Sequence, residues 1–233
     1  MSYPFDLSKS LESFSGRAPL FPLPEVAFFP NVLLPLHIFE PRYRQMTADA
    51  LDGDRHIAMA QLKPGWERRA DRDLPPIYDY VCLGRITAEE RLADGRYYLI
   101  LQGLARARVL SEETTDLPYR VARLELRPDR GAQPAIIDRE NRRREILEAF
   151  RDLYPRLDLD KLLHEAADVA CSLGVVCDVV AASLRLPAEQ SQEILAEEDV
   201  DLRSDLVLAR LRELRRKAQG PPRPKTFPPE FSA

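Results

Sequence analysis

The chain has 233 residues, of which 45% are hydrophobic and 31% are charged. This apolar content is enough for a buried core and argues against disorder throughout, and the length allows one large domain or two small ones. The 34 Lys and Arg residues nearly balance the 38 Asp and Glu residues, and the pI is near 5.6. The overall charge therefore favours neither a nucleic acid nor an anionic membrane as partner.

The start of the chain and its cysteines indicate a compartment. Residues 1–16 contain no basic stretch followed by an apolar core, so they do not read as a secretory signal. The longest apolar runs are far shorter than the roughly 20 residues that span a bilayer. Cys82, Cys171 and Cys177 are an odd and sparse set, which argues against a disulfide framework. We therefore predict a cytoplasmic protein that does not associate with membranes.

Short apolar runs broken by Pro, Gly and Asp fill the first half, a pattern typical of strands. Asp94 and Gly95 form a hairpin signal, so we expect consecutive strands to pair antiparallel. Pro41 suits the first position of one short helix that runs on to Gly53. Seven strands are predicted: 20–23, 33–38, 57–62, 80–87, 97–102, 105–111 and 119–126. Such strands fit a compact barrel or a folded-over sheet.

From about Asp138 onward, apolar residues recur at three- and four-residue spacing, which predicts helices. Three stripes lie within 146–154, 159–170 and 175–184, Pro187 opens a short helix, and Asp199 or Asp201 caps a last one. The stripes would be buried together in a helical bundle that docks on the barrel. The fold class is therefore α+β. Beyond Arg216 the chain is rich in Pro, which predicts a flexible tail.

Three segments resemble the amino-terminal region of the Lon protease family. They are PLFPLPEVAFFPNVLLPLHIFEPRYRQM at 19–46, DGRYYLILQGLARARV at 94–109 and VVCDVVAASLRLPAEQSQEILAEEDVDLR at 175–203. The resemblance covers about 19–216 and implies a barrel related to the pseudouridine-synthase-associated (PUA) fold, followed by helices, in a region that helps to select polypeptide substrates. It suggests an extension at 1–17, a Lon-N-like β-barrel domain at 18–130, a helical bundle domain at 131–217 and the Pro-rich tail at 218–233.

No pattern in the sequence predicts catalysis. None of the nine glycines precedes a Lys, so a Walker A phosphate loop is absent, and the Ser–Lys peptidase of the family lies on a separate carboxy-terminal domain. His37, His56, His164 and the cysteines lack the close spacing that a zinc site needs. We therefore predict a free-standing, non-catalytic member of the family with no catalytic residue, no metal and no cofactor.

Aromatic residues are the candidates for polypeptide binding. Phe28 and Phe29 are adjacent, so in extended backbone their side chains point to opposite sides, and Trp66 lies in a polar loop away from any apolar pattern. Two interpretations are open: these rings bind a partner, or they fold back onto the barrel. The expected partners are unfolded or degron-bearing polypeptides, or a full-length protease, as for an adaptor or quality-control factor.

The alternative function is an RNA-associated accessory protein. PUA-like barrels include RNA binders, and residues 139–146 are rich in Arg. Because Glu140 and Glu145 interleave with these arginines, the run also reads as the solvated start of a helix.

Overall fold

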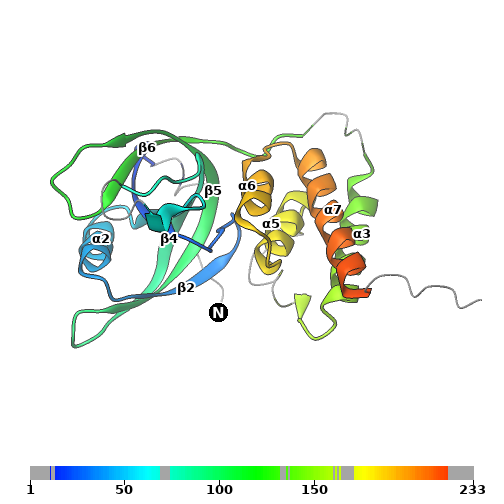
Figure 1. Ribbon diagram of the computed structural model, residues 1–233, viewed down its shortest axis with the longest axis horizontal. Coiled ribbons are helices and arrows are strands. Elements are labelled where there is room, and N and C mark those ends of the chain that lie inside the picture. The colour runs from blue at the N-terminus through cyan, green and yellow to red at the C-terminus, as the bar shows by residue number, and fades with distance from the viewer. Residues whose placement is uncertain are drawn as a thin grey trace, which may run out of the picture.

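The computed structural model describes residues 11, 14–68, 74–131, 135, 137–159, 161, 163 and 171–219. Strands occupy the first half and helices the second (Figure 1). The sheet with its short helix lies at one end of the molecule, and the carboxy-terminal helices lie at the other. The described residues do not include His164, most of the apolar stripe predicted at 159–170 or most of the Pro-rich tail.

Six strands form one sheet in the order β2-β5-β4-β3-β1-β6, and β5 also pairs with β6. The pairings of β5, β4, β3, β1 and β6 therefore run in a closed circuit, while β2 is attached to β5 alone. The strands are β1 (Arg17–Leu23), β2 (Leu33–Ile38), β3 (His56–Gln61), β4 (Tyr80–Arg91), β5 (Tyr97–Glu113) and β6 (Arg120–Leu126).

The pairing differs in two respects from the expected antiparallel order of consecutive strands. Consecutive strands from β3 to β6 do pair antiparallel, and Gly95 takes the positive φ of +83° in the turn between β4 and β5. The expectation was wrong for β1, which pairs with β3 in parallel, and for β2, which pairs with β5. The helix between β2 and β3 returns the chain to run alongside β1, as a parallel pair requires.

The two strands predicted at 97–102 and 105–111 are a single strand, β5. Gly103 lies in the gap between the two predicted strands, where β5 continues with a register shift in its pairing with β4. The segment before β2 packs against the Gly103 backbone at this point. The Asn31 amide donates to the Gly103 carbonyl at 2.9 Å, and the Gly103 amide donates to the Val32 carbonyl at 2.8 Å. A Cβ on Gly103 would lie 2.1 Å from the carbonyl oxygen of Phe29. Glycine is therefore needed for a close approach between backbones.

The helix α2 (Pro41–Asp52) begins with Pro41 in its first turn, as predicted. It packs on β1 and β2 through Tyr43, Met46 and Ala50, which are buried. The Tyr119 hydroxyl, just before β6, donates to the Asp49 carboxylate at 2.6 Å. This bond fixes α2 against the beginning of β6.

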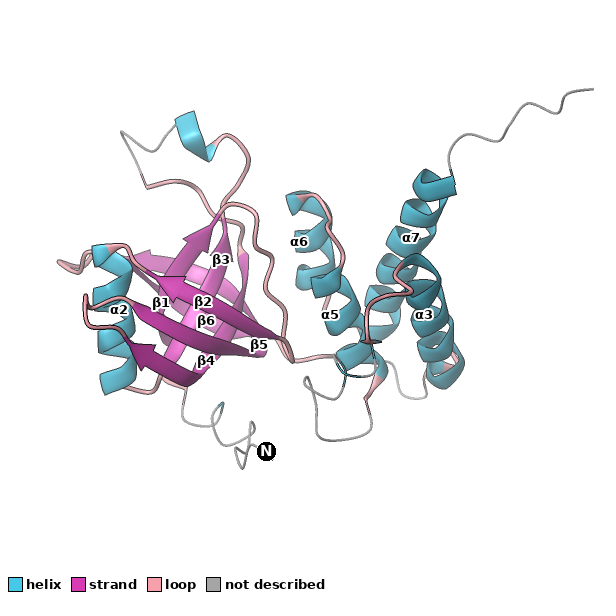
Figure 2. Ribbon diagram, turned by 90° about the horizontal axis from the view of Figure 1, so that it is seen from below, coloured by secondary structure: helices cyan, strands magenta, loops and turns pink. Residues whose placement is uncertain are grey.

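The remaining helices are α3 (Arg139–Leu153), α5 (Leu173–Ser183), α6 (Ala188–Ala196) and α7 (Val200–Gln219). Asp138 and Ser172 cap α3 and α5 by accepting bonds from backbone amides. Asp199 is the predicted cap of the last helix, because it accepts from the Asp201 and Leu202 amides at 2.8 and 3.2 Å. The helices α3, α5 and α7 pack on one another, and α6 lies nearest the sheet, in contact with β4 (Figure 2).

Candidate functional site

A groove of about 890 Å³ lies on the part of the sheet domain that carries α2 and the 3-10 turn η1 (Trp66–Arg68). It is bounded by the end of β1, the start of α2, the approach to η1 and the connection from β5 to β6. Apolar and aromatic side chains predominate in its lining, which is Pro22, Arg42, Tyr43, Leu62, Trp66, Leu74, Pro75, Glu112, Glu113, Thr114, Thr115, Leu117, Pro118, Tyr119 and Arg120. We call it the Trp66 groove.

Three aromatic rings from separate elements line the Trp66 groove. Tyr43 of α2 packs against Phe21 at 4.5 Å between ring centroids, and the Arg42 guanidinium lies 4.4 Å from its ring. Trp66 is half-buried and packs on a buried apolar cluster that includes Leu62 and Ile77. Burial and the bond to Asp49 raise the pKa of Tyr119, so its hydroxyl stays protonated and its ring stays in place. The walls of the groove are thus fixed by packing and hydrogen bonds.

The charged groups that line the groove are already paired. Arg120 binds the Glu112 carboxylate through two bonds of 2.6 and 2.5 Å and donates to the Pro75 carbonyl at 2.7 Å. Arg42 binds Glu40 at 2.9 Å, and Glu113 accepts from Arg17 at 2.8 Å. Glu40 and Arg42 thus form an exposed ion pair at the start of α2. The groove therefore offers shape and apolar surface and has little net charge.

The three predicted binding residues lie in different places. Phe28 and Phe29 are in the core, with exposed fractions of 3% and 1%, which matches the interpretation that they fold back onto the sheet. Trp66 lines the groove. Polypeptide binding by any of the three remains a prediction. The sequence by itself does not single out Tyr43, Leu117 or the other groove residues. Their one local signal is the run Leu-Pro-Tyr at 117–119, an apolar cluster in a connection.

A second hollow of about 510 Å³ lies on the outer face of β2, β4 and β5. His37 and Tyr98 stack there with ring centroids 4.7 Å apart, and Tyr98 and the nearby Phe39 are 50% and 59% exposed. It is smaller than the Trp66 groove and is lined by residues of three strands only.

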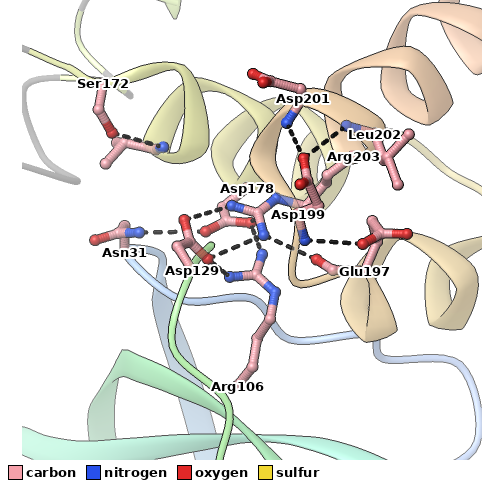
Figure 3. Close-up of polar contacts among 11 residues, drawn as sticks. Asn31, Arg106, Asp129, Ser172, Asp178, Glu197, Asp199, Asp201, Leu202 and Arg203 are labelled. Carbon is pink, nitrogen blue, oxygen red and sulfur yellow. Dashed lines mark hydrogen bonds and ion pairs between the residues drawn. The ribbon is translucent and has the colours of Figure 1, made fainter. Parts of the chain in front are cut away.

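Buried charges join the sheet to the helices (Figure 3). Arg106 of β5 donates to Asp129 at 2.6 Å and also to Asp178 of α5, while Arg203 of α7 holds Asp129 by two bonds of 2.9 and 2.5 Å. Asn31 donates to Asp178 at 3.3 Å. Burial raises the pKa of Asp178 above its ordinary value against the opposing effect of the two guanidinium groups.

This buried network contains residue types that active sites use, but its positive and negative charges cancel, as in a structural connection. Two cations, Arg106 and Arg203, face two carboxylates, Asp129 and Asp178, so no charge is left uncompensated. Three of the four side chains are at most 2% exposed. The network therefore fixes how the helices sit on the sheet.

Three of the four arginines in 139–146 are also engaged with carboxylates. Arg139 binds Asp201 at 2.7 Å, Arg143 binds Glu140 at 2.8 Å, and Arg142 pairs with Asp205. Their charges are neutralised within the helical half, which gives the RNA alternative no support.

Within the part of the chain that the structure describes, no three His, Cys, Asp or Glu side chains are grouped as a metal ion would require. No helix among the described residues is both long and apolar enough to cross a bilayer. His56 lies with its Nδ1 2.9 Å from the Asp54 carboxylate.

The thiols give a prediction that is simple to test. Burial raises the pKa of Cys177 to about 12 and that of Cys82 still further, whereas Cys171 is only half-buried. Because the thiolate is the reactive form, we expect Ellman's reagent at pH 8 to modify Cys171 rapidly and the other two only after denaturant is added. Stopped-flow absorbance with and without guanidinium measures this. Three equally fast thiols in the native protein would contradict the burial described.

Comparison with known proteins identifies the family. Residues 17–213 match the family described as the ATP-dependent protease La (LON) substrate-binding domain. The chain belongs to this family. The predicted resemblance to the Lon amino-terminal domain is thereby confirmed.

Curated relatives are Lon proteases of bacteria. The chain is 28% identical over 206 residues to a Lon protease of Anaeromyxobacter dehalogenans and 29% identical over 199 residues to Lon protease 2 of Myxococcus xanthus. These alignments cover 84% and 82% of this chain but 23% of each relative. The chain therefore spans about a quarter of the length of the Lon proteases it matches.

Solved structures show the same fold. The Lon N-terminal domain protein from Xanthomonas campestris superposes with a TM-score of 0.57 at 22% identity, covering 83% of this chain and 97% of that one. The N-terminal domain of the Mycobacterium avium complex Lon protease gives 0.61 at 12% identity, covering 84% and 98%. The sheet with its carboxy-terminal helices is thus the fold of Lon N-terminal domains.

Proposed function

We propose that this Lon-family domain is a non-catalytic module that binds unfolded or degron-bearing polypeptides in the Trp66 groove. The observation that carries the proposal is the groove itself: about 890 Å³, with the half-buried ring of Trp66 and the largely buried rings of Tyr43 and Tyr119 in its lining and its charges paired. A large ring at a partly exposed apolar surface, as Trp66 is, is a usual anchor of polypeptide binding. The family's description as a substrate-binding domain supports the same function.

The finer parts of the proposal concern role and organisation. We propose that the protein acts in the cytoplasm as an adaptor or quality-control factor, either alone or beside a full-length Lon protease. The closed circuit of strands supports a PUA-like barrel at 18–130, and the mutual packing of α3, α5 and α7 supports a helical bundle at 131–217. The absence of a Gly-Lys phosphate loop from the sequence supports a non-catalytic role.

The single tryptophan of the chain gives a direct test, because its emission reports on the groove alone. We expect a reduced, carboxymethylated and therefore unfolded protein to change Trp66 emission in a saturable way, and the same protein in its native form to leave it unchanged. Trp66→Ala should weaken retention of the unfolded protein on a column by about tenfold, since a buried aromatic anchor contributes more than 1 kcal/mol.

The control is Tyr98→Ala, which removes a half-exposed ring from the second hollow and leaves the groove intact. Its retention should equal that of the unaltered protein. If Trp66→Ala retains the unfolded protein as well as Tyr98→Ala does, the groove is not the binding site. If native and unfolded proteins are retained equally, the proposed function is wrong.

A further inference from the structure

One wall of the Trp66 groove stands on two short, paired pieces of chain. Residues 61–63 continue from the end of β3, and residues 76–78 return beside them in an antiparallel bridge with two backbone hydrogen bonds of 2.8 and 2.9 Å. We call these two pieces the neck. The groove residues that lie in the neck or between its pieces are Leu62, Trp66, Leu74 and Pro75. The geometry of the neck therefore sets the direction in which this wall leaves the sheet.

The helix α6 contacts both pieces of the neck from one face. The Gln192 side-chain amide donates to the Gln61 side-chain carbonyl at 3.1 Å, and these two residues are 7% and 3% exposed. Glu189 lies three residues earlier, on the same face of the helix, and accepts a hydrogen bond from the Tyr78 hydroxyl. Burial and this carboxylate raise the pKa of Tyr78, so its hydroxyl keeps the proton that it donates. One helical face therefore binds the outgoing and the returning piece of the neck.

The carboxy-terminal end of α6 is fixed at the junction of sheet and helices. The backbone carbonyl of its capping residue, Glu197, accepts a hydrogen bond at 2.9 Å from Arg203, which belongs to the buried charge network (Figure 3). The next residue, Glu198, pairs with Arg127 and Arg130. The contacts that place the helices on the sheet therefore also place α6 at the neck.

We propose that Gln192 and Glu189 are positioning residues of the Trp66 groove: they hold the neck, and with it the wall that carries Trp66, at the place set by the helices. The polypeptide site thus depends on both halves of the molecule, although only the first half lines it. This inference rests on the proposed function and adds the residues that position its site.

The readout must be the folded site, because a contact that only stabilises the fold alters unfolding and leaves that site unchanged. Glu189→Ala and Gln192→Met remove the two contacts from the full chain. We expect each to weaken binding of the reduced, carboxymethylated protein about fivefold and to move the Trp66 emission of the unbound protein to longer wavelength. Fluorescence titration without denaturant measures both effects.

Glu193→Ala is the matched control, because Glu193 lies on the same helix but binds Arg210 of α7 at 2.7 Å. It should change neither the affinity nor the emission. Since Glu189 is exposed, Glu189→Ala decides the matter if the buried replacement Gln192→Met does not fold.

The outcomes separate the inference from the proposed function. A lower urea midpoint with unchanged affinity and emission overturns the inference and leaves the proposed function standing, and so does an equal effect of Glu193→Ala. If the unaltered protein does not bind the unfolded protein, the proposed function fails. A shifted emission in Glu189→Ala but not in Glu193→Ala then still supports the positioning of Trp66, and an unshifted emission overturns it.

Discussion

Replacing Asp178 with Ala is expected to lower the free energy of unfolding by about 3–5 kcal/mol, because it leaves buried arginines without their partner. Arg106 and Arg203 are 2% and 0% exposed, and both lie within ion-pair distance of the Asp178 carboxylate. After the replacement, Asp129 alone would face two guanidinium groups. Urea unfolding followed by far-ultraviolet circular dichroism measures the loss.

A matched surface pair provides the control for Asp178→Ala. Glu140 binds Arg143 at 2.8 Å on α3, and its side chain is 62% exposed. Removing it as Glu140→Ala should leave the free energy of unfolding almost unchanged, since exposed pairs three residues apart on a helix contribute little. Equal losses for Glu140→Ala and Asp178→Ala would show that the buried network does not hold the sheet and helices together.

The parts of the fold that the sequence predicts are those with local causes. Pro41 has a ring that suits the first turn of a helix, and Gly95 accepts the positive φ of a tight turn, so α2 and the turn between β4 and β5 are visible in the sequence. The alternation of Ala122, Arg123 and Leu124 predicts β6 for the same reason, because side chains on a strand alternate between its faces.

The parts that the sequence does not predict depend on distant contacts. Arg106 and Arg203 are separated by almost a hundred residues and come together only in the fold, where both donate to Asp129. Likewise, Tyr43 and Tyr119 line the Trp66 groove from elements far apart in the chain, and no spacing in the sequence predicts that they lie close together. Trp66 could be singled out because a large ring in a polar loop is conspicuous by itself.

Replacing Gly103 with Ala is the second change with a large expected effect. The added Cβ would lie 2.1 Å from the Phe29 carbonyl oxygen and 3.1 Å from the Cα of Pro30. These are backbone atoms, so they cannot turn aside as a side chain could, and the segment that leads into β2 must shift. The shift would disturb the bonds between Gly103 and the residues Asn31 and Val32. We expect a loss of about 3 kcal/mol, at the upper end for overpacking.

Gly84→Ala is the comparison that isolates the cause. Its added Cβ would come within 2.7 Å of Leu101 and 3.0 Å of Phe28, but through side-chain carbons. Those side chains can change rotamer, so Gly84→Ala should cost less than Gly103→Ala in the same urea unfolding measurement. If the order is reversed, or if Gly103→Ala is neutral, the segment 29–32 does not rest on β5 as described. Gly103 would then be the strand break that its place between two apolar runs suggests.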